Sequence, residues 1–167
     1  MKAMTRENLS VAFAGASQAH MKYLAFAAKA AREGQPNIAR LFTAIAYAEQ
    51  VHATNHLKEL GGIGDTVANL GAAIDGETFE VDEMYAAYLA VAEEQEEKGA
   101  ERSMTYAIEA EKIHADMYGD AKATAEAGED IQIGQVYICP VCGFTHIGEP
   151  PDRCPVCNVM SERFKAF

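Results

Sequence analysis

The chain has 167 residues, of which 49% are hydrophobic, and its 14 Lys and Arg against 25 Asp and Glu give a formal net charge of −11. This composition predicts a folded chain with a packed core, and it argues against nucleic acid or anionic membrane as the main partner, because both require a basic surface. The N-terminus lacks an apolar run behind a basic start, and no apolar stretch is long enough to span a membrane. We therefore expect a soluble, cytoplasmic protein.

Residues 1–133 are predicted to form four helices with short connections. Short connections make consecutive helices antiparallel, so an all-α four-helix bundle is expected, and the longer connection between the second and third helices has room to cross it. Gly and Pro mark the helix ends, and Asp65 is a candidate N-cap for the third helix. The predicted helices are Thr5–Arg32, Pro36 to about Gly61, Thr66–Lys98 and Ala100–Ala127.

Residues 134–167 differ in composition from the rest of the chain. They contain all four cysteines and four of the five prolines, and their three basic and three acidic residues cancel, so the whole net charge lies in residues 1–133. This shift predicts a domain boundary at 133/134, between an acidic helical bundle and a small module rich in Cys and Pro.

Acidic and histidine side chains interrupt the apolar stripes of three predicted helices. An unpaired carboxylate on a buried stripe is costly, whereas carboxylate and imidazole at an i, i+3 spacing share one helix face and can bind a common metal. A ferritin-like di-metal centre uses Glu from two helices and Glu-x-x-His from the other two. The pairs are Glu49 with His52, Glu111 with His114, and Glu77 with Glu80. Solvated surface charge is the alternative interpretation, and the threefold recurrence disfavours it.

The helical segment is also internally duplicated. The two Glu-x-x-His pairs recur at an offset of 62 residues, and Tyr23 and Tyr85 share that offset. Gly15-Ala16 aligns with Gly76-Glu77 at an offset of 61. By this symmetry position 16 should be Glu, but it is Ala. The first helix therefore offers no carboxylate to the centre.

The last 34 residues contain two Cys-x-x-Cys knuckles, which predict a four-thiolate metal site. Two disulfides are the alternative, and a cytoplasmic location disfavours them. Sequence spacing alone does not separate zinc from iron. The four thiolates are Cys139, Cys142, Cys154 and Cys157, and the aromatic side chains expected around them are Tyr137, Phe144, Phe164 and Phe167.

The full arrangement resembles the rubrerythrin family, which joins a ferritin-like di-iron domain to a rubredoxin-like domain. The resemblance runs from Phe13-Ala-Gly-Ala-Ser-Gln-Ala to Arg163-Phe164 and includes Gly76-Glu77-Thr-Phe-Glu80, both Glu-x-x-His pairs and both knuckles. It implies a peroxidase that reduces hydrogen peroxide to water at the di-iron centre, in defence against oxidative stress. It also implies iron in the four-cysteine site, refilled with electrons by rubredoxin or an NAD(P)H-dependent reductase.

The resemblance implies a role for each matching residue. Glu49 and Glu111 correspond to carboxylates that bridge the metals, and Glu77 and His114 to terminal ligands of one iron. The remaining assignments are Glu80 and His52 as alternative ligands of the other iron, and Tyr23 and Tyr85 as tyrosines that orient carboxylates.

Ala16 departs from the family, which carries a terminal Glu ligand at this position. We expect weaker metal retention and slower or absent turnover, with an engineered substitution as one interpretation and His20, one turn away, as a candidate replacement ligand. Two rival functions stay open: a ferritin-like iron-binding ferroxidase without peroxide turnover, and a structural zinc module on a degenerate bundle. We also expect a homodimer, with helix exchange as an option, because the four-cysteine module of a monomer is expected to lie too far from the bundle centre.

Overall fold

The structure, a computed structural model, describes all 167 residues. It divides the chain into two compact units, Met1–Gly64 and Asp65–Phe167. The helical elements are α1 (Ala3–Arg32), α2 (Pro36–Glu59), α3 (Thr66–Phe79), a π-helical turn (Glu80–Met84), α4 (Tyr85–Glu94), α5 (Lys98–Glu126) and a 3-10 turn (Ser161–Arg163). The strands are β1 (Val136–Ile138), β2 (Thr145–Ile147) and β3 (Lys165–Ala166).

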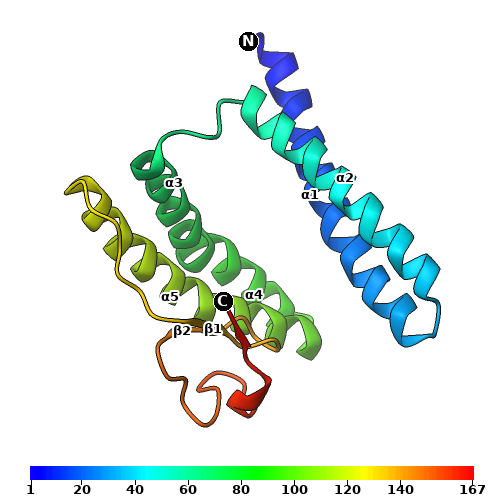
Figure 1. The fold of residues 1–167 in the computed structure, drawn as a ribbon, viewed down its shortest axis with the longest axis vertical. Helices are drawn as coiled ribbons and strands as arrows, with labels where there is room; N and C mark the ends of the chain where they lie inside the picture. The colour runs from blue at the N-terminus through cyan, green and yellow to red at the C-terminus, as the bar shows by residue number, and fades with distance from the viewer. The chain divides into compact units, whose positions relative to one another are not determined.

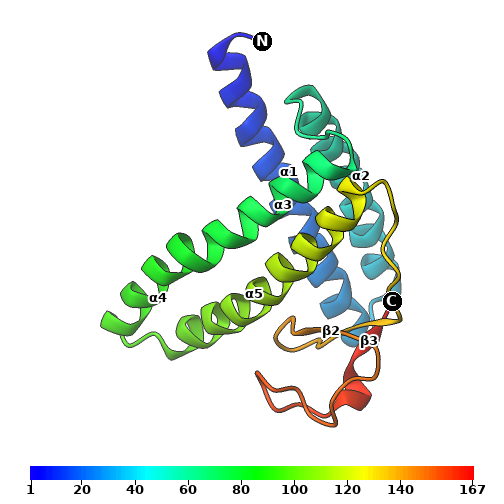
Figure 2. The same ribbon diagram turned by 90° about the vertical axis from the view of Figure 1, so that its left-hand side faces the viewer.

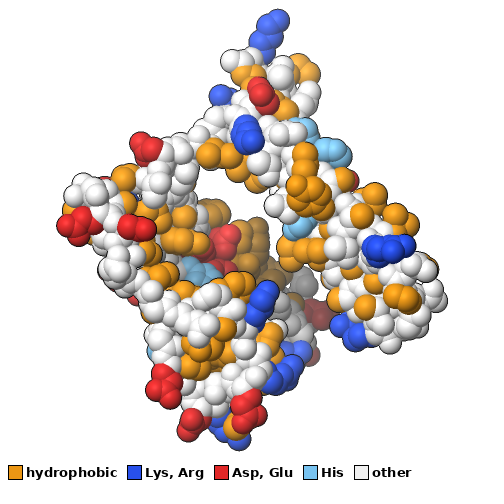
Figure 3. All heavy atoms as spheres, in the orientation of Figure 1, with side chains coloured by type: hydrophobic (Ala, Val, Ile, Leu, Met, Phe, Trp, Pro, Cys, Tyr) orange, Lys and Arg blue, Asp and Glu red, His pale blue; other side chains and the backbone are white.

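The first unit is a hairpin of α1 and α2, which run side by side (Figure 1). Gly34 adopts a φ of 74° two residues after the last residue of α1, and Pro36 is the first residue of α2, as the sequence predicts for a helix stop followed by a helix start. The buried residues of both helices are all alanines, which let the two backbones approach closely. Larger apolar side chains of α2 are exposed, including Leu41 at 62%. Hydrophobic side chains are visible on the surface of the molecule in Figure 3.

The predicted third helix, Thr66–Lys98, proves to be three elements. Asp65 caps it as expected, because its Oδ1 accepts a 2.8 Å hydrogen bond from the Ala68 N–H. The α-helical pattern then gives way at Glu80 to a π-helical turn, and α4 ends at Glu94 rather than Lys98. Lys98 instead begins α5. A π turn inserts one extra residue into the helix and is frequent at functional sites.

In the second unit α5 packs against α3, the π turn and α4 (Figure 2). The C-terminal module follows as a three-stranded sheet in the order β2-β1-β3, antiparallel throughout. Tyr137 pairs with His146 on one side of β1 and with Ala166 on the other. This sheet joins the beginning, middle and end of the module and holds its two cysteine knuckles.

None of the helices combines the length and the apolar composition that a bilayer crossing requires.

Candidate metal centres

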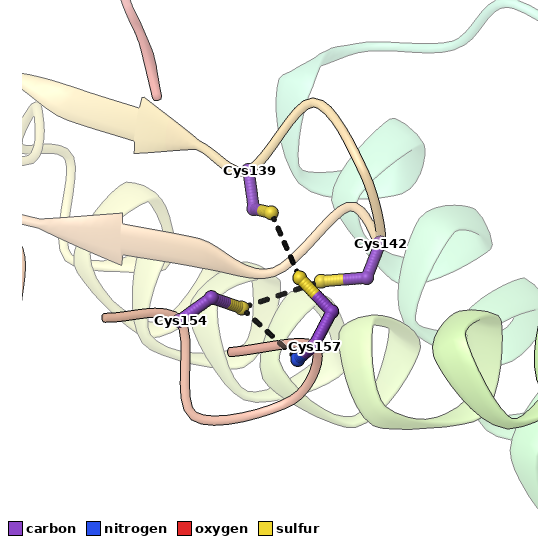
Figure 4. Close-up of side chains that lie close together, drawn as sticks. All are labelled: Cys139, Cys142, Cys154 and Cys157. Carbon is purple, nitrogen blue, oxygen red and sulfur yellow. Dashed lines mark hydrogen bonds between the residues drawn. The ribbon is translucent and has the colours of Figure 1, made fainter. Parts of the chain in front are cut away.

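The four cysteines converge at one end of the small sheet. Cys139 and Cys142 come from the turn after β1, Cys154 and Cys157 from the turn before the 3-10 segment, and their sulfurs point toward one another (Figure 4). Cys139 Sγ lies 3.5 Å from Cys157 Sγ, and Cys142 Sγ lies 3.4 Å from Cys154 Sγ. The two knuckles thus contribute one pair each to a single cluster, in which all four sulfurs lie within 4.8 Å of one another.

These distances fit a metal rather than disulfides. A disulfide needs sulfurs at about 2.05 Å, and all four cysteines are free. A tetrahedral ion with metal–sulfur bonds of about 2.3 Å would place the sulfurs about 3.8 Å apart, close to the separations in the cluster. The expectation of a four-cysteine metal site in place of two disulfides is confirmed.

Burial and backbone donors shape the acidity of the thiols. Burial raises the pKa of Cys142 and of Cys157. At Cys154 burial also opposes ionisation, but the N–H groups of Cys157 and Val156 point at the sulfur and hold the pKa of that thiol below its ordinary value. The Cys157 N–H to Cys154 Sγ distance is 3.5 Å. A cation bound at the centre would displace the remaining thiol protons, as thiolate ligation requires.

The apolar surroundings of the knuckles come partly from outside the module. Phe144 and Phe164 pack against the cysteines as predicted, whereas Phe167 is 65% exposed. Tyr106 and Ile113 of α5 complete the cluster, and the sequence pattern did not predict them. The signal that could have found them is their i, i+7 spacing, which places both on one face of the last helix.

A second group of candidate ligands lies on α3 and α5 of the same unit. Glu77, Glu111 and His114 each offer a ligand atom, and these atoms lie within 4.8 Å of one another. Glu111 Oε2 is 2.6 Å from His114 Nδ1, as expected for an i, i+3 pair on one helix face. Carboxylate oxygens and imidazole nitrogen form a donor set that iron accepts. The structure therefore brings together three of the predicted metal ligands.

The carboxylates of this group perturb one another. Burial, a hydrogen bond to Glu111, and the charges of Glu111 and Glu80 together raise the pKa of Glu77 to about 7. Burial and the Glu111 charge also raise the pKa of Glu80, which begins the π turn. The negative charges of these three carboxylates therefore repel one another, and a bound divalent metal would offset that repulsion.

The charges of the same carboxylates also act on Tyr85, the first residue of α4. Its pKa is raised by burial and then by the charges of Glu80, Glu111 and Glu77. Its phenol therefore keeps its proton and remains a hydrogen-bond donor beside the carboxylates. Its role as a tyrosine that orients a carboxylate stays a prediction.

The remaining predicted ligands, Glu49 and His52, lie on α2 in the first unit. His52 Nδ1 is 3.5 Å from Glu49 Oε2, a looser version of the pair on α5, and the His52 side chain is 58% exposed. Tyr23, on α1, packs its ring 6.1 Å from that of Phe42. The first unit thus carries one Glu-x-x-His pair with its tyrosine, and the second unit carries the other.

Ala16 is buried in α1 at 9% exposure. His20, one turn further along, places its Nδ1 2.8 Å from the carbonyl oxygen of Ala46 on α2. Because a carbonyl can only accept, the His20 Nδ1–H donates this bond. His20 thus links α1 to α2 by a hydrogen bond, and its role as a replacement ligand stays a prediction.

The C-terminal module packs directly on α5. His114 Nε2 lies 2.8 Å from Thr145 Oγ1 on β2, and an added Cβ at Gly143 would meet the Ala110 Cβ at 3.5 Å. The expectation that this module lies far from the bundle ligands within one chain is wrong, because β2 hydrogen-bonds to His114 of the same chain. Spacing along the sequence carries no signal for this contact.

Both parts of the chain are similar to known proteins. The family profile of rubrerythrin matches residues 7–122, and that of the rubredoxin-like domain of rubrerythrin matches residues 137–165. The chain belongs to the rubrerythrin family. Rubrerythrin-2 of Clostridium acetobutylicum is 48% identical over 99% of this chain and 97% of its own length. Nigerythrin of Nitratidesulfovibrio vulgaris is 37% identical over 98% of this chain and 86% of its own.

Solved structures agree with this membership. Nigerythrin in its fully reduced, all-ferrous state matches with a TM-score of 0.58 at 33% identity, covering 98% of this chain and 86% of the other. Its mixed-valent state matches with a TM-score of 0.56. The predicted fold class, a ferritin-like helical domain followed by a rubredoxin-like module with four cysteines, is confirmed.

Membership also defines the cofactor class. A rubrerythrin chain carries a di-iron centre in the helical domain and one iron in the four-cysteine site, and it is an oxidoreductase. The residues present fit both groups: four converging thiols at one site, and a carboxylate and imidazole cluster at the other.

Proposed function

We propose that this chain is a non-haem di-iron peroxidase that reduces hydrogen peroxide to water, with electrons passed through the iron of the four-cysteine site, in defence against oxidative stress. One observation carries the proposal: the unit Asp65–Phe167 contains both the four-cysteine cluster and a Glu77–Glu111–His114 cluster. A single hydrogen bond, from His114 to Thr145, connects the two parts. An electron-transfer site attached to a candidate peroxide site is the arrangement that a peroxidase needs.

The proposed ligands divide between two helical hairpins. Glu111 and Glu49 are proposed to bridge the metals, and Glu77 with His114 to complete one iron site. Glu80 and His52 are proposed to alternate at the other iron with its oxidation state. The support comes from membership in the family and from the proximity of Glu77 and Glu111 to His114. Residues 1–133 are proposed as the di-iron domain and residues 134–167 as the electron-transfer domain.

When bound, the di-iron centre supplies the two electrons that convert hydrogen peroxide and two protons into two molecules of water. The residues of this chain hold and move the protons. The Glu77 carboxyl, with its pKa raised to about 7 chiefly by burial, exchanges a proton near neutral pH in the metal-free protein. Tyr85 keeps its phenolic proton and orients a carboxylate by donating to it, and Tyr23 is proposed to do the same in the other half.

The proposal includes an impaired centre. With Ala16 in place of a Glu, the iron served by Glu80 and His52 loses one carboxylate, and water fills the position. We propose weaker retention of that iron and slower turnover than in a chain with the complete ligand set.

A homodimer with exchanged helices is the proposed assembly. The α1–α2 hairpin buries only alanines, while Ile38, Leu41 and Ile45, spaced three and four residues apart on α2, are 46%, 62% and 44% exposed. A second copy of this chain offers the complementary hairpin, because the two halves of the sequence are duplicates. The four-cysteine module contacts α5 of its own chain, so an exchange of the α1–α2 hairpins between two chains would leave this contact in place.

The physiological reductant is proposed to be rubredoxin or an NAD(P)H-dependent reductase acting at the iron of the four-cysteine site. The four free cysteines support a reducing, cytoplasmic location.

A ferritin-like iron-binding or ferroxidase function is the second candidate. Ala16 favours it, because loss of a terminal ligand impairs turnover more directly than it impairs iron entry. The attached four-cysteine module argues against it, because storage of iron has no need of an electron-transfer site.

The test is a stopped-flow reaction of the anaerobically reduced protein with hydrogen peroxide, alongside the iron content per chain. We expect peroxide to restore the visible absorption of the oxidised iron–thiolate site, with about two electrons consumed per peroxide. The control is the same protein with zinc bound by the four cysteines, which cannot supply the electron. If the iron–thiolate site stays reduced while peroxide persists, the peroxidase proposal fails and the ferroxidase remains.

A further inference from the structure

His114 uses both ring nitrogens, and they face different parts of the molecule. Nδ1 lies 2.6 Å from Glu111 Oε2 on the side of the carboxylate cluster. Nε2 lies 2.8 Å from Thr145 Oγ1, on β2 of the four-cysteine module. Thr145 is 6% exposed, and it is the one buried polar side chain of the chain. A buried hydroxyl needs hydrogen-bond partners, so its arrangement here is well determined.

The direction of the bond follows from the single proton of the Thr145 hydroxyl. Thr145 Oγ1 is also 3.0 Å from the carbonyl oxygen of Gly143, which can only accept. The hydroxyl proton therefore belongs to that bond, and Oγ1 accepts from His114. Consequently Nε2 of His114 carries a proton. A proton also lies between Nδ1 and Oε2 of Glu111, which are 2.6 Å apart, and a metal bound by these two atoms would replace that proton.

We propose that Thr145 is a positioning residue for the di-iron centre, which fixes the proton of His114 on Nε2 and so directs Nδ1 to the metal. The inference rests on the proposed role of His114 as a ligand. A ligating histidine normally donates its other N–H to a carboxylate, carbonyl or water, which sets the ring orientation. Here that acceptor comes from the electron-transfer module rather than from the bundle.

The close docking of the first knuckle on α5 makes this possible. Gly143, with a φ of 82°, turns the chain after Cys142 and brings it against Ala110, which is 3% exposed and directly precedes Glu111. The Gly143 N–H donates a 3.0 Å bond to the Cys139 carbonyl. Three hydrogen bonds thus link Cys139 to His114 through Gly143 and Thr145. A module held together by its own metal therefore orients a ligand of the other centre.

The test compares Thr145→Val, which keeps the shape but removes the hydroxyl, with Thr145→Ser, which keeps it. The full chain is prepared with zinc bound by the four cysteines and then titrated with Zn²⁺ at the bundle site, because zinc is diamagnetic. Long-range ¹H–¹⁵N spectra of ¹⁵N-histidine protein report which nitrogen of His114 binds the metal. The chain has five histidines, and His114→Gln assigns the signal.

We expect the parent and Thr145→Ser to show metal on Nδ1 and a protected proton on Nε2. Thr145→Val should lose that protection and bind Zn²⁺ at the bundle site about 10–100-fold more weakly. The matched control is Thr105→Val on an exposed face of α5, where the Thr105 hydroxyl donates a 2.8 Å bond to the Glu101 carbonyl of its own helix.

Two results would overturn the proposal, and they differ in what else they overturn. If Thr145→Val keeps Nδ1 ligation, the Nε2 proton and parental affinity while only its melting temperature falls, Thr145 merely docks the module and the function stands. If His114 of the parent shows no change on Zn²⁺ binding, its assignment as a ligand fails, together with this inference.

Discussion

Glu111 and His114 approach within 2.6 Å on α5, whereas the duplicate pair, Glu49 and His52 on α2, is separated by 3.5 Å. The same i, i+3 spacing thus produces one tight and one loose pair. Glu77 offers a ligand atom within 4.8 Å of those of Glu111 and His114, and Thr145 hydrogen-bonds to the other ring nitrogen of His114. Because its neighbours in the second unit already hold it, we expect the site built on Glu111 and His114 to be the better-ordered half of the metal centre.

The first prediction concerns the missing carboxylate. Ala16→Glu should raise iron occupancy per chain and increase the peroxidase rate. Residues that only hydrogen-bond to a metal ligand change metal affinity by roughly tenfold or more, and we expect a carboxylate that binds the iron directly to contribute at least as much. Iron content and peroxide consumption measure the two effects. Ala30→Glu, at an equally buried alanine of α1, is the control for burying a carboxylate. Unchanged occupancy and rate in Ala16→Glu would contradict our account of Ala16.

The second prediction is a pH dependence of the metal-free bundle. The pKa of Glu77 is raised from 4.5 to about 7, first by burial and then by Glu111 and Glu80. A group that binds its proton more tightly when folded stabilises the fold fully below its unfolded pKa, and this stability is lost as pH rises through the folded pKa. The melting temperature of chelator-treated protein should therefore fall as pH rises from about 5 to 8.

Glu77→Gln should flatten this dependence because the amide does not titrate. The matched control is Glu109→Gln on α5, whose side chain is 45% exposed and paired with Lys112. A circular-dichroism melt at each pH measures the effect. A Glu77→Gln protein that keeps the full parental slope would show that another group is responsible.

The third prediction tests helix exchange. One chain carries Glu49→Gln and His52→Gln, the other carries Glu111→Gln and His114→Gln, and two different affinity tags isolate the mixed dimer. With exchange, one site of that dimer receives both altered hairpins and the other receives none. The mixed dimer should therefore hold about half of the bundle iron of the parent, measured as iron in excess of the four-cysteine site.

Each variant alone is the control, and both should lack an intact bundle site. A mixed dimer that binds no more bundle iron than the variants alone would exclude exchange. A monomer in solution would exclude the dimer itself.

The fourth prediction concerns the four-cysteine module. Cys142→Ser should abolish the visible colour of the oxidised iron and make residues 134–167 sensitive to protease, because so small a module depends on its metal for stability. The helices should remain folded by circular dichroism. A protease-resistant module without its metal would show that packing on Tyr106 and Ile113 suffices.

Much of the candidate site could be predicted from sequence because its chemistry is locally encoded. Two residues three apart on a helix share a face whatever the rest of the fold does, so Glu111 and His114 were predicted as a pair. The same holds for the Cys-x-x-Cys knuckles, where the chain between two cysteines is too short to separate them. The helix cap at Asp65 is equally local. The π turn at Glu80 escaped prediction because a single turn is too short for its periodicity to be distinguished from that of the flanking α-helices.

The sequence by itself determined the helices, the two kinds of ligand set and the absence of a carboxylate at Ala16, since each depends on residue type and short spacing. Only the tertiary structure decided that Thr145 reaches His114 and that Tyr106 and Ile113 cover the thiolates. The first of these contacts joins residues 31 positions apart, and the others bring α5 against the cysteine knuckles. These contacts require that the first cysteine knuckle and α5 pack closely at Gly143 and Ala110. The periodicity of a sequence does not reveal whether two surfaces are complementary in shape.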